Sequence, residues 1–270
     1  LNSILFQYRT NNGELETIDC AGGYIPNNEW TRINLRIITS GGGIYGGGDR
    51  VRIIFYLDGK EVDRESSTNP ISPTSSEKYF TIGADPYSLI YDNDYECYLN
   101  NERQYYGVLD EVRINSGSLP NDPWVDNAER IGRELFFIDF DEQGGDYIID
   151  QTKNDMDGMV YSLDDNSKWG SNGVYGGYFQ NLSIGSTSYY GEIPDNDDLH
   201  VQELTLEAWI NPKDDWEPVH DHINIVSKAY NSQSQPYYSF YLKITRDLKI
   251  VFGVGADNPY QECAVSSLND

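Results

Sequence analysis

The sequence predicts an all-β chain folded as an antiparallel β-sandwich. Three observations support this prediction: apolar and polar residues alternate with a period of two, turn-forming residues recur at short spacing, and helical periodicity is almost absent. In Leu204–Ile210, the even-numbered positions are apolar, whereas Thr205 and Glu207 between them are polar. This alternation places one face of a strand in a core and the other outside it. Many such strands with almost no helix are typical of a sandwich.

Further strands are expected along the whole chain. The same pattern predicts them at Ile4–Tyr8, Thr31–Ile38, Val51–Leu57, Tyr79–Ile82, Val108–Ile114, Glu134–Phe140, His222–Ser227, Tyr238–Ile244 and Lys249–Val254. Dipeptides such as Asp58-Gly59 mark the turns between strands, because both residue types tolerate positive φ. A short helix is expected only at Pro123–Arg130, where the preceding residues can cap it.

The chain of 270 residues is strongly acidic. Nineteen Lys and Arg against 44 Asp and Glu give a net charge of 19 − 44 = −25. Such a surface repels phosphate backbones and anionic lipid, so nucleic acid is not an expected partner. No run approaches 18 apolar residues, and no membrane insertion is expected either. Cations are the natural counter-species, and Ca²⁺ takes the hard oxygen ligands that this chain has in excess.

Zinc and phosphate sites are not expected. The three cysteines include no C-x-x-C pair, and three histidines add too few ligands for a zinc set. The stretch Gly41–Gly48 holds six glycines and predicts a loop. Neither a Lys nor a helix start follows it, so it does not match a phosphate-binding loop.

One loop is a candidate calcium site. Asp150, Thr152, Asn154 and Asp157 place side-chain oxygens within one turn-rich stretch, which suits Ca²⁺. It is not an EF-hand, since the bidentate Glu at loop position twelve is missing. The alternative is an Asx-type turn that is solvated by water. A second candidate is Asp92–Glu96, where acidic residues alternate.

Aromatic residues in loops are candidate contacts for a sugar. Tyr87, Tyr91 and Trp216, and also Tyr45, lie in polar loops, where a ring offers a flat apolar surface beside hydrogen-bonding groups. The alternative for each ring is packing within its own loop. Three tryptophans in or beside strands are expected to be structural: Trp30, Trp169 and Trp209.

Several motifs resemble those of one known family. Tyr106–Asn115, followed by Leu119-Pro120, resembles the closing strand of laminin-G-like jelly rolls, which belong to the concanavalin-A-like lectins. Trp30–Ile33 and Phe55–Lys60 resemble the central strand pair of that family. Phe80–Gly83 resembles the strand that follows this pair. The resemblance implies a jelly-roll form of the predicted sandwich.

The pattern then begins again. Leu135–Phe140, Asp150–Gly158 and Leu204–Pro212 resemble the opening strands of the same family, and Ile225–Lys228 and Tyr238–Ile244 continue the series. Together these motifs cover most of the chain.

The order of the motifs suggests tandem repeats. Residues 1–118 resemble the C-terminal half of one sandwich, residues 134–270 resemble the N-terminal half of a second, and residues 119–133 form a linker with the short helix. The first expectation is therefore two separate sandwiches, each completed by residues outside this chain. A single permuted sandwich and completion by neighbouring chains are the alternatives.

The two ends of the sequence also overlap in the register of the family. Ile4–Tyr8, followed by Cys20-Ala21, corresponds to Ile250–Val254, followed by Cys263-Ala264. From Cys20 to Cys263 is 263 − 20 = 243 residues, about one repeat with its linker.

The resemblance implies an extracellular or cell-surface location and a non-catalytic recognition or adhesion module of a larger protein. Its expected partners are a glycan or a surface protein, together with neighbouring repeats or copies of itself. It also implies a structural calcium near an edge of the sandwich, with Asp110 as one contributor. One alternative is a structural subunit of a surface layer, sheath or filament. Another is an accessory carbohydrate-binding module of a secreted glycanase. In an exported chain, Asn181 lies in an N-glycosylation sequon.

Catalysis is not expected. Glycoside hydrolases need two carboxylates across the sugar bond, and no strand carries alternating acids such as Glu-x-Asp-x-x-Glu. Asp110 and Glu111 are adjacent in a predicted strand, so they are expected to face opposite sides of the sheet.

The family register also predicts a disulfide between Cys20 and Cys97. Export permits disulfides, and Cys97 lies late in the same half-domain as Cys20, which leaves Cys263 to pair beyond residue 270. Mass spectrometry of unreduced peptides should therefore find Cys20 joined to Cys97. A link between Cys97 and Cys263 would contradict the pairing and would indicate one sandwich closed from both halves.

Overall fold

The computed structural model of the chain is a β structure. The residues it describes are 4–9, 15–20, 25–40, 50–67, 80–83, 90–92, 97–99, 105, 107–116, 133–142, 144–161, 168–181, 190–199, 204–213, 222–229, 238–245 and 250–254. Within these ranges every regular element is a strand, apart from the single 3-10 turn Asp197–Leu199. The same ranges contain no helix with the length and apolar character needed to cross a bilayer.

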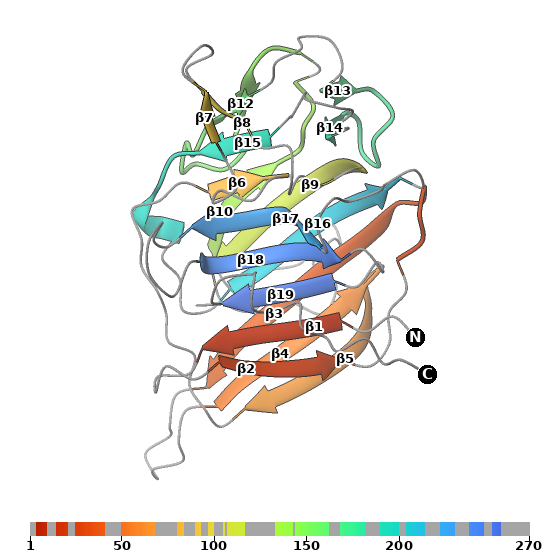
Figure 1. Cartoon of the computed structure of the whole chain (residues 1–270), viewed down its shortest axis with the longest axis vertical. Helices are drawn as coiled ribbons and strands as arrows, with labels where there is room; N and C mark the ends of the chain where they lie inside the picture. Colours follow the sequence, from red (N-terminus) through yellow and green to blue (C-terminus); the bar gives the residue numbers. More distant parts are fainter. Residues whose placement is uncertain are drawn as a thin grey trace.

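The first sheet has nine strands and lies in front in Figure 1. Their order across the sheet is β11 (Tyr147–Ile148), β12 (Gly158–Tyr161), β15 (Tyr190–Ile193), β6 (Phe80–Ile82), β17 (His222–Ala229), β18 (Tyr238–Thr245), β19 (Ile250–Val254), β1 (Ile4–Arg9) and β2 (Leu15–Cys20).

The second sheet has eight strands and lies behind the first. Its order is β13 (Trp169–Gly170), β14 (Tyr178–Asn181), β9 (Gly107–Ser116), β16 (Leu204–Pro212), β3 (Thr31–Ser40), β4 (Arg50–Leu57) and β5 (Lys60–Ser67), with β10 (Arg133–Ile138) also paired to β9. A separate two-stranded sheet joins β7 (Ile90–Asp92) to β8 (Cys97–Leu99).

One hydrophobic core lies between the two large sheets. The alternation predicted for β16 holds, because Leu204, Leu206, Ala208 and Ile210 all belong to this core. Residues from many other strands join them, among them Leu35, Phe55, Phe80, Ile114, Phe136 and Phe252. The prediction of an all-β sandwich is therefore confirmed.

The two halves of the chain are interleaved in both sheets. β16 pairs with β3 on one side, from Leu204↔Ile37 to Ile210↔Thr31, and with β9 on the other. In the nine-stranded sheet, β6 likewise lies between β15 and β17. This arrangement differs from the two separate sandwiches that we expected first, because strands of both halves belong to one sandwich. The physical reason is that each half alone would expose an apolar face and open strand edges.

Strands lie at every place where the sequence predicts them, but some of them have different bounds. Asp58 and Gly59 form the expected turn between β4 and β5, with φ of 50° and 75°. The strand predicted at Glu134–Phe140 ends at Ile138, since Phe140 has a φ of 54°. The short helix predicted at Pro123–Arg130 falls outside the described residues.

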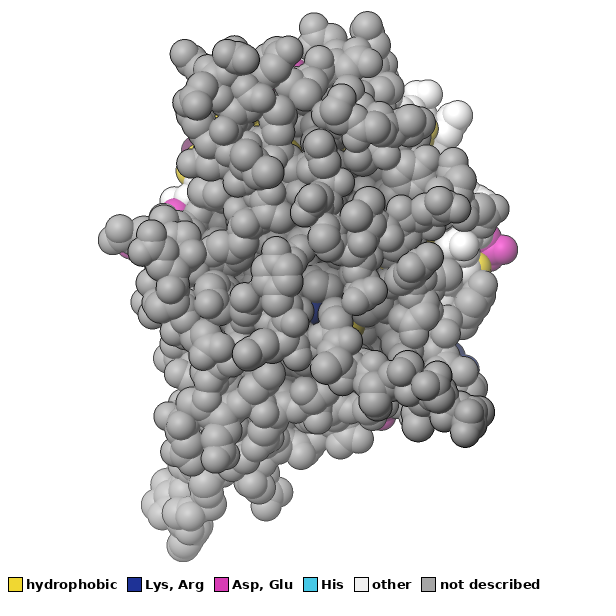
Figure 2. Space-filling view, viewed as in Figure 1, with side chains coloured by type: hydrophobic (Ala, Val, Ile, Leu, Met, Phe, Trp, Pro, Cys, Tyr) yellow, Lys and Arg dark blue, Asp and Glu magenta, His cyan; other side chains and the backbone are white. Residues whose placement is uncertain are grey.

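A few acidic side chains of described residues are visible at the edges of the view in Figure 2. Inside the fold, in contrast, a lysine is buried. Lys228 in β17 has no exposed surface, and its Nζ forms an ion pair with Asp195, which follows β15. Burial lowers the pKa of Lys228, and the hydrogen bond and charge of Asp195 oppose that shift. The pair therefore ties β17 to the end of β15.

Lys228→Ala should lower the free energy of unfolding by about 3 kcal/mol, because it removes a buried cation and leaves Asp195 without that partner. The double variant Lys228→Met/Asp195→Asn should recover much of this loss, because no charge is then left unpaired. Urea unfolding measures both values. Lys60→Ala, at an exposed position in β5, is the control and should change stability by less than about 0.5 kcal/mol. Equal stability of Lys228→Ala and the wild type would contradict a role for the pair.

Candidate functional site

The outer face of the eight-stranded sheet is polar. In β16, the residues between the core positions are Thr205, Glu207, Trp209 and Asn211, and they point away from the core. The neighbouring strand β3 follows the same rule. Its core residues alternate with three polar ones: Arg32, Asn34 and Arg36.

Strand pairing aligns these side chains in rows across the sheet. Glu207 lies opposite Arg113 of β9 and opposite Asn34 of β3, and the amide of Asn34 donates to its carboxylate. In the next row, Trp209 lies opposite Asp110 and Arg32. The guanidinium of Arg32 is 5.8 Å from the Trp209 ring centroid, which is a cation–π distance.

Some buried polar atoms on this face have no hydrogen-bond partner within the described part of the chain. They are Asn34 Oδ1, Arg36 Nε and Nη2, the Tyr56 hydroxyl and both amide atoms of Asn115. Burial lowers the pKa of Arg36, and Tyr56, whose ring centroid is 4.9 Å from the guanidinium, partly opposes that shift. Buried groups of this kind are normally satisfied by water or by a ligand.

A β-bulge interrupts β9 in the middle of this face. Glu111 has a φ of 53°, and the pairing with β16 shifts between Glu207 and Trp209. As a result, Leu109 and Val112 both reach the core with two residues between them. Bulges redirect side chains in this way.

The bulge places Asp110 and Glu111 on the same, outer face. Glu111 accepts a hydrogen bond from Arg113, and Asp110 lies opposite the outward-facing Trp209. The expectation that these two acids face opposite sides is therefore wrong. Strict alternation fails because Glu111 adopts a left-handed backbone conformation.

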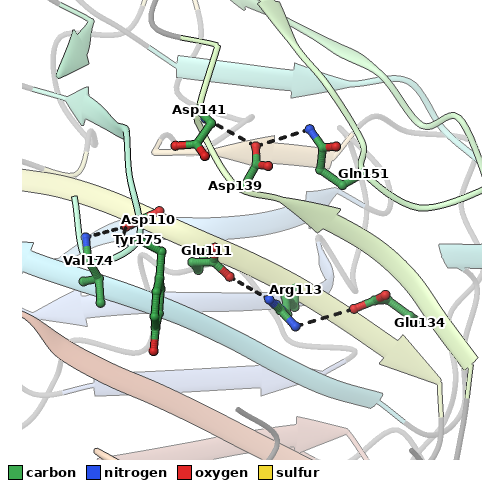
Figure 3. Close-up of polar contacts among 9 residues, drawn as sticks. All are labelled: Asp110, Glu111, Arg113, Glu134, Asp139, Asp141, Gln151, Val174 and Tyr175. Carbon is green, nitrogen blue, oxygen red and sulfur yellow. Dashed lines mark hydrogen bonds and ion pairs between the residues drawn. The ribbon is translucent and has the colours of Figure 1, made fainter. Parts of the chain in front are cut away.

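Asp110 anchors the loop at residues 173–177 (Figure 3). Its Oδ2 accepts hydrogen bonds from the backbone N–H of Val174 at 2.7 Å and of Tyr175 at 3.3 Å. Its Oδ1 has no partner among the described residues. Burial raises the pKa of Asp110 to about 7, and the charge of Glu111 adds to the shift, although backbone donors that include Val174 and Tyr175 act in the opposite direction. The carboxyl is fully buried, so its role here is to hold the loop.

The glycines of this loop allow its close approach to the sheet. A Cβ at Gly173 would lie 1.8 Å from the Gly177 carbonyl and 2.7 Å from Asp110 Oδ2. Gly176 has a φ of 141°, and a Cβ there would collide with Asp141. The carboxylate of Asp141 also accepts a hydrogen bond from the Gly177 N–H. The carboxylates of Asp110 and Asp141 thus hold the loop on the sheet. Tyr175 lies between Gly173 and Gly176.

Further charged groups surround the bulge (Figure 3). Arg113 donates to Glu111 at 2.7 Å and lies 3.8 Å from Glu134 of β10. Burial raises the pKa of Glu111, and Arg113 partly counters the shift, while Asp139 and Asp141 add to it. One arginine therefore offsets part of the negative charge of a crowded acidic region.

Four aromatic side chains on the outer face form what we call the aromatic platform: Trp30, Tyr175, Tyr178 and Trp209. Tyr175 and Trp209 meet edge to face, with ring centroids 6.3 Å apart and an interplanar angle of 70°. Trp30 and Tyr178 form a second such pair at 6.3 Å and 61°. Tyr175 is 58 % exposed, and the other three rings are half-buried. Tyr175 is therefore the exposed ring of the platform, whereas the polar side chains of the neighbouring rows are buried.

The predicted calcium loop is held together by its own hydrogen bonds. Asp150 Oδ1 accepts from the N–H groups of Phe137 and Thr152, each at 3.0 Å. Its Oδ2 accepts from the Thr152 hydroxyl at 2.8 Å and from Met156 N–H at 3.1 Å. Asp157 accepts from the N–H of Asp150 at 2.9 Å. These contacts match the Asx-type turn that was the alternative.

Three of the predicted metal ligands thus lie in one loop, where the carboxylates of Asp150 and Asp157 accept hydrogen bonds. The side-chain amide of Asn154 donates to the Leu135 carbonyl at 2.6 Å, and Asp110 is engaged by a different loop. Within the described ranges, no group of three His, Cys, Asp or Glu side chains is arranged to hold a metal. Calcium binding remains a prediction from the resemblance.

Other predicted site residues lie wholly or partly outside the description. Tyr87 and Trp216 are not described, and neither is most of Asp92–Glu96. For Tyr91 in β7, Cys20 in β2, Cys97 in β8 and Asn181 in β14, only the backbone is described. Asn181 ends its strand opposite Gly107. The proposed disulfide and glycosylation therefore remain predictions.

The structure also identifies residues that sequence reasoning missed. Tyr175 was not considered, although Gly173 and Gly176-Gly177 on either side of it were a usable signal for a tight, exposed loop. Trp30 and Trp209 were expected to be structural, and both are half-buried and packed against tyrosine rings of the outer face. Trp169 does pack against the core.

Comparison with family models, curated proteins and solved structures finds no match for this chain.

Asp110→Asn should remove a pH dependence of stability. In the wild type the folded pKa of about 7 exceeds the ordinary 3.8, so ionisation disfavours the folded state and stability falls as the pH rises between these values. From pH 5 to pH 8 the wild type should lose about 2 kcal/mol relative to Asp110→Asn, measured by urea unfolding at both pH values.

Two further variants complete this test. Asp110→Ala should lose about 2 kcal/mol even at pH 5, because the N–H groups of Val174 and Tyr175 lose their acceptor. Asp155→Asn, an exposed position, should show the pH dependence of the wild type. Parallel pH profiles of the wild type and Asp110→Asn would show that the Asp110 pKa is not raised.

Proposed function

We propose that this chain is a non-catalytic glycan-recognition module that binds its ligand on the aromatic platform. The observation that carries the proposal is the exposed Tyr175 ring, set edge to face on the half-buried Trp209, whose ring in turn contacts Arg32. A sugar ring has apolar faces and a polar rim. A binding site for it therefore combines flat aromatic surface with hydrogen-bonding groups of fixed orientation.

Rigid presentation of Tyr175 supports the proposal. Its loop is held to the sheet through Asp110 and Asp141, and glycines on both sides allow the close approach on which these contacts depend. A ring fixed before binding loses little conformational entropy when a ligand arrives. Tyr and Trp are favoured at recognition surfaces for this reason.

The charge of the site favours a neutral glycan. Asp141 contacts the 173–177 loop, Asp139 and Asp141 both act on the nearby Glu111, and the whole chain has a net charge of −25. An anionic sugar would be repelled at long range. Catalysis is not part of the proposal, because the carboxyl of Asp110 is fully buried beneath the loop and cannot reach a dissolved substrate.

Glycan-array screening of the full chain, followed by calorimetry, tests this function. A neutral oligosaccharide should bind, and Tyr175→Ala should weaken that binding at least about tenfold, since it removes the exposed ring. Tyr175→Phe should retain most of the affinity. The matched control is Tyr147→Ala, which removes a 64 % exposed tyrosine from the edge strand β11. Absence of glycan binding, or equal binding by Tyr175→Ala and the wild type, would refute the proposal.

A further inference from the structure

The joint between β19 and β1 differs from every other strand pair that the structure describes. It is the only parallel pair, whereas all other described pairs are antiparallel. Its register is Leu5↔Val251, Phe6↔Phe252, Gln7↔Gly253 and Tyr8↔Val254. Parallel neighbours in a sheet normally require a crossover connection within the chain, and here the two strands are the first and the last that are described.

The register coincides with the repeat in the sequence. Ile4–Tyr8 and Ile250–Val254 are similar at an offset of 250 − 4 = 246 residues, with Ile and Phe at the same places. The paired residues in the structure have the same offset, since 251 − 5 = 246. Two strands with Ile and Phe at matching positions therefore lie side by side, position against position. β19 is antiparallel to β18, and β1 is parallel to β19. β1 therefore runs in the same direction as β19, antiparallel to β18.

This geometry points to continuation from one copy of the chain to the next. We propose that β19 of one copy binds the β1–β2 hairpin of a second copy, in the register seen here within one chain, so that copies associate head to tail. The partner surface is the edge of β19, which without β1 would be an open strand edge. Since β19 and β1 are different surfaces, the contact is heterologous. It leaves an unpaired β1–β2 hairpin at one end of the assembly and an unpaired β19 edge at the other.

The closed chain and the open assembly contain the same strand contact. Within one chain, the tether gives the hairpin an effective concentration on the order of millimolar. Dilute protein is therefore expected to close on itself, while crowding on a surface or refolding at high concentration favours exchange between copies.

Crosslinking between two single-cysteine chains tests the proposal. In a background of Cys20→Ser, Cys97→Ser and Cys263→Ser, one chain carries Tyr8→Cys and the other Val254→Cys, which are paired in the joint. The two are unfolded, mixed, refolded at about 1 mM to match the effective concentration of the tether, and treated with a short bis-maleimide. The expected product is a crosslinked heterodimer of about twice the 30.7 kDa chain mass.

The control pair is Lys243→Cys and Val251→Cys, which face each other across β18 and β19 within one chain. Mixed in the same way, it should give no heterodimer. Sedimentation of the unmodified chain, refolded at the same concentration, should show dimers and larger species. A monomer in sedimentation together with no excess of heterodimer over the control would overturn the proposal. Glycan binding by the monomer is measured separately, so the two proposals fail independently.

Discussion

The fold depends on the insertion of β16 between β9 and β3. Each of the two chain halves has strands with one apolar face, and neither half alone forms a closed sandwich. Leu204–Ile210 lie between strands of the other half, and this placement buries the apolar faces in one core. Burial stabilises the fold by about 25 cal/mol for each Å² of apolar surface removed from water. A half with an open core would lose more burial free energy than the net stability of a typical domain. Interleaving is therefore the constraint that the other features follow.

The same insertion creates the candidate site. β16 continues across the bulge at Glu111, and this bulge lets both Leu109 and Val112 reach the core. Its consequence on the outer face is that Asp110 is free to accept the N–H groups of the 173–177 loop. The loop then carries Tyr175 over Trp209. Packing inside the sandwich thus determines, through one left-handed residue, where an exposed aromatic ring lies outside it.

Sequence reasoning predicted what local pattern controls. Alternation located β3, β4 and β16, and Asp58-Gly59 forms the turn that these residue types favour. It could not predict the bulge in β9, because Glu111 has no intrinsic preference for positive φ and tertiary pairing imposes it. Strands of two residues, such as β11 and β13, carry too little alternation to detect. The oxygen-rich loop at Asp150 was correctly located, but backbone donors within reach of its carboxylates are visible only in three dimensions.

The two proposals concern different sheets, and this separation gives them a combined meaning. The aromatic platform lies on the outer face of the eight-stranded sheet, whereas the joint between β19 and β1 lies within the nine-stranded sheet. Head-to-tail association through that joint would leave the platform of each copy in place. A row of identical weak sites gains avidity for a repetitive ligand without any new contact, provided that the spacing of the sites fits the ligand. A polysaccharide is such a ligand. If both proposals hold, association through the edge of one sheet would let a module with a small aromatic site attach strongly to a glycan surface.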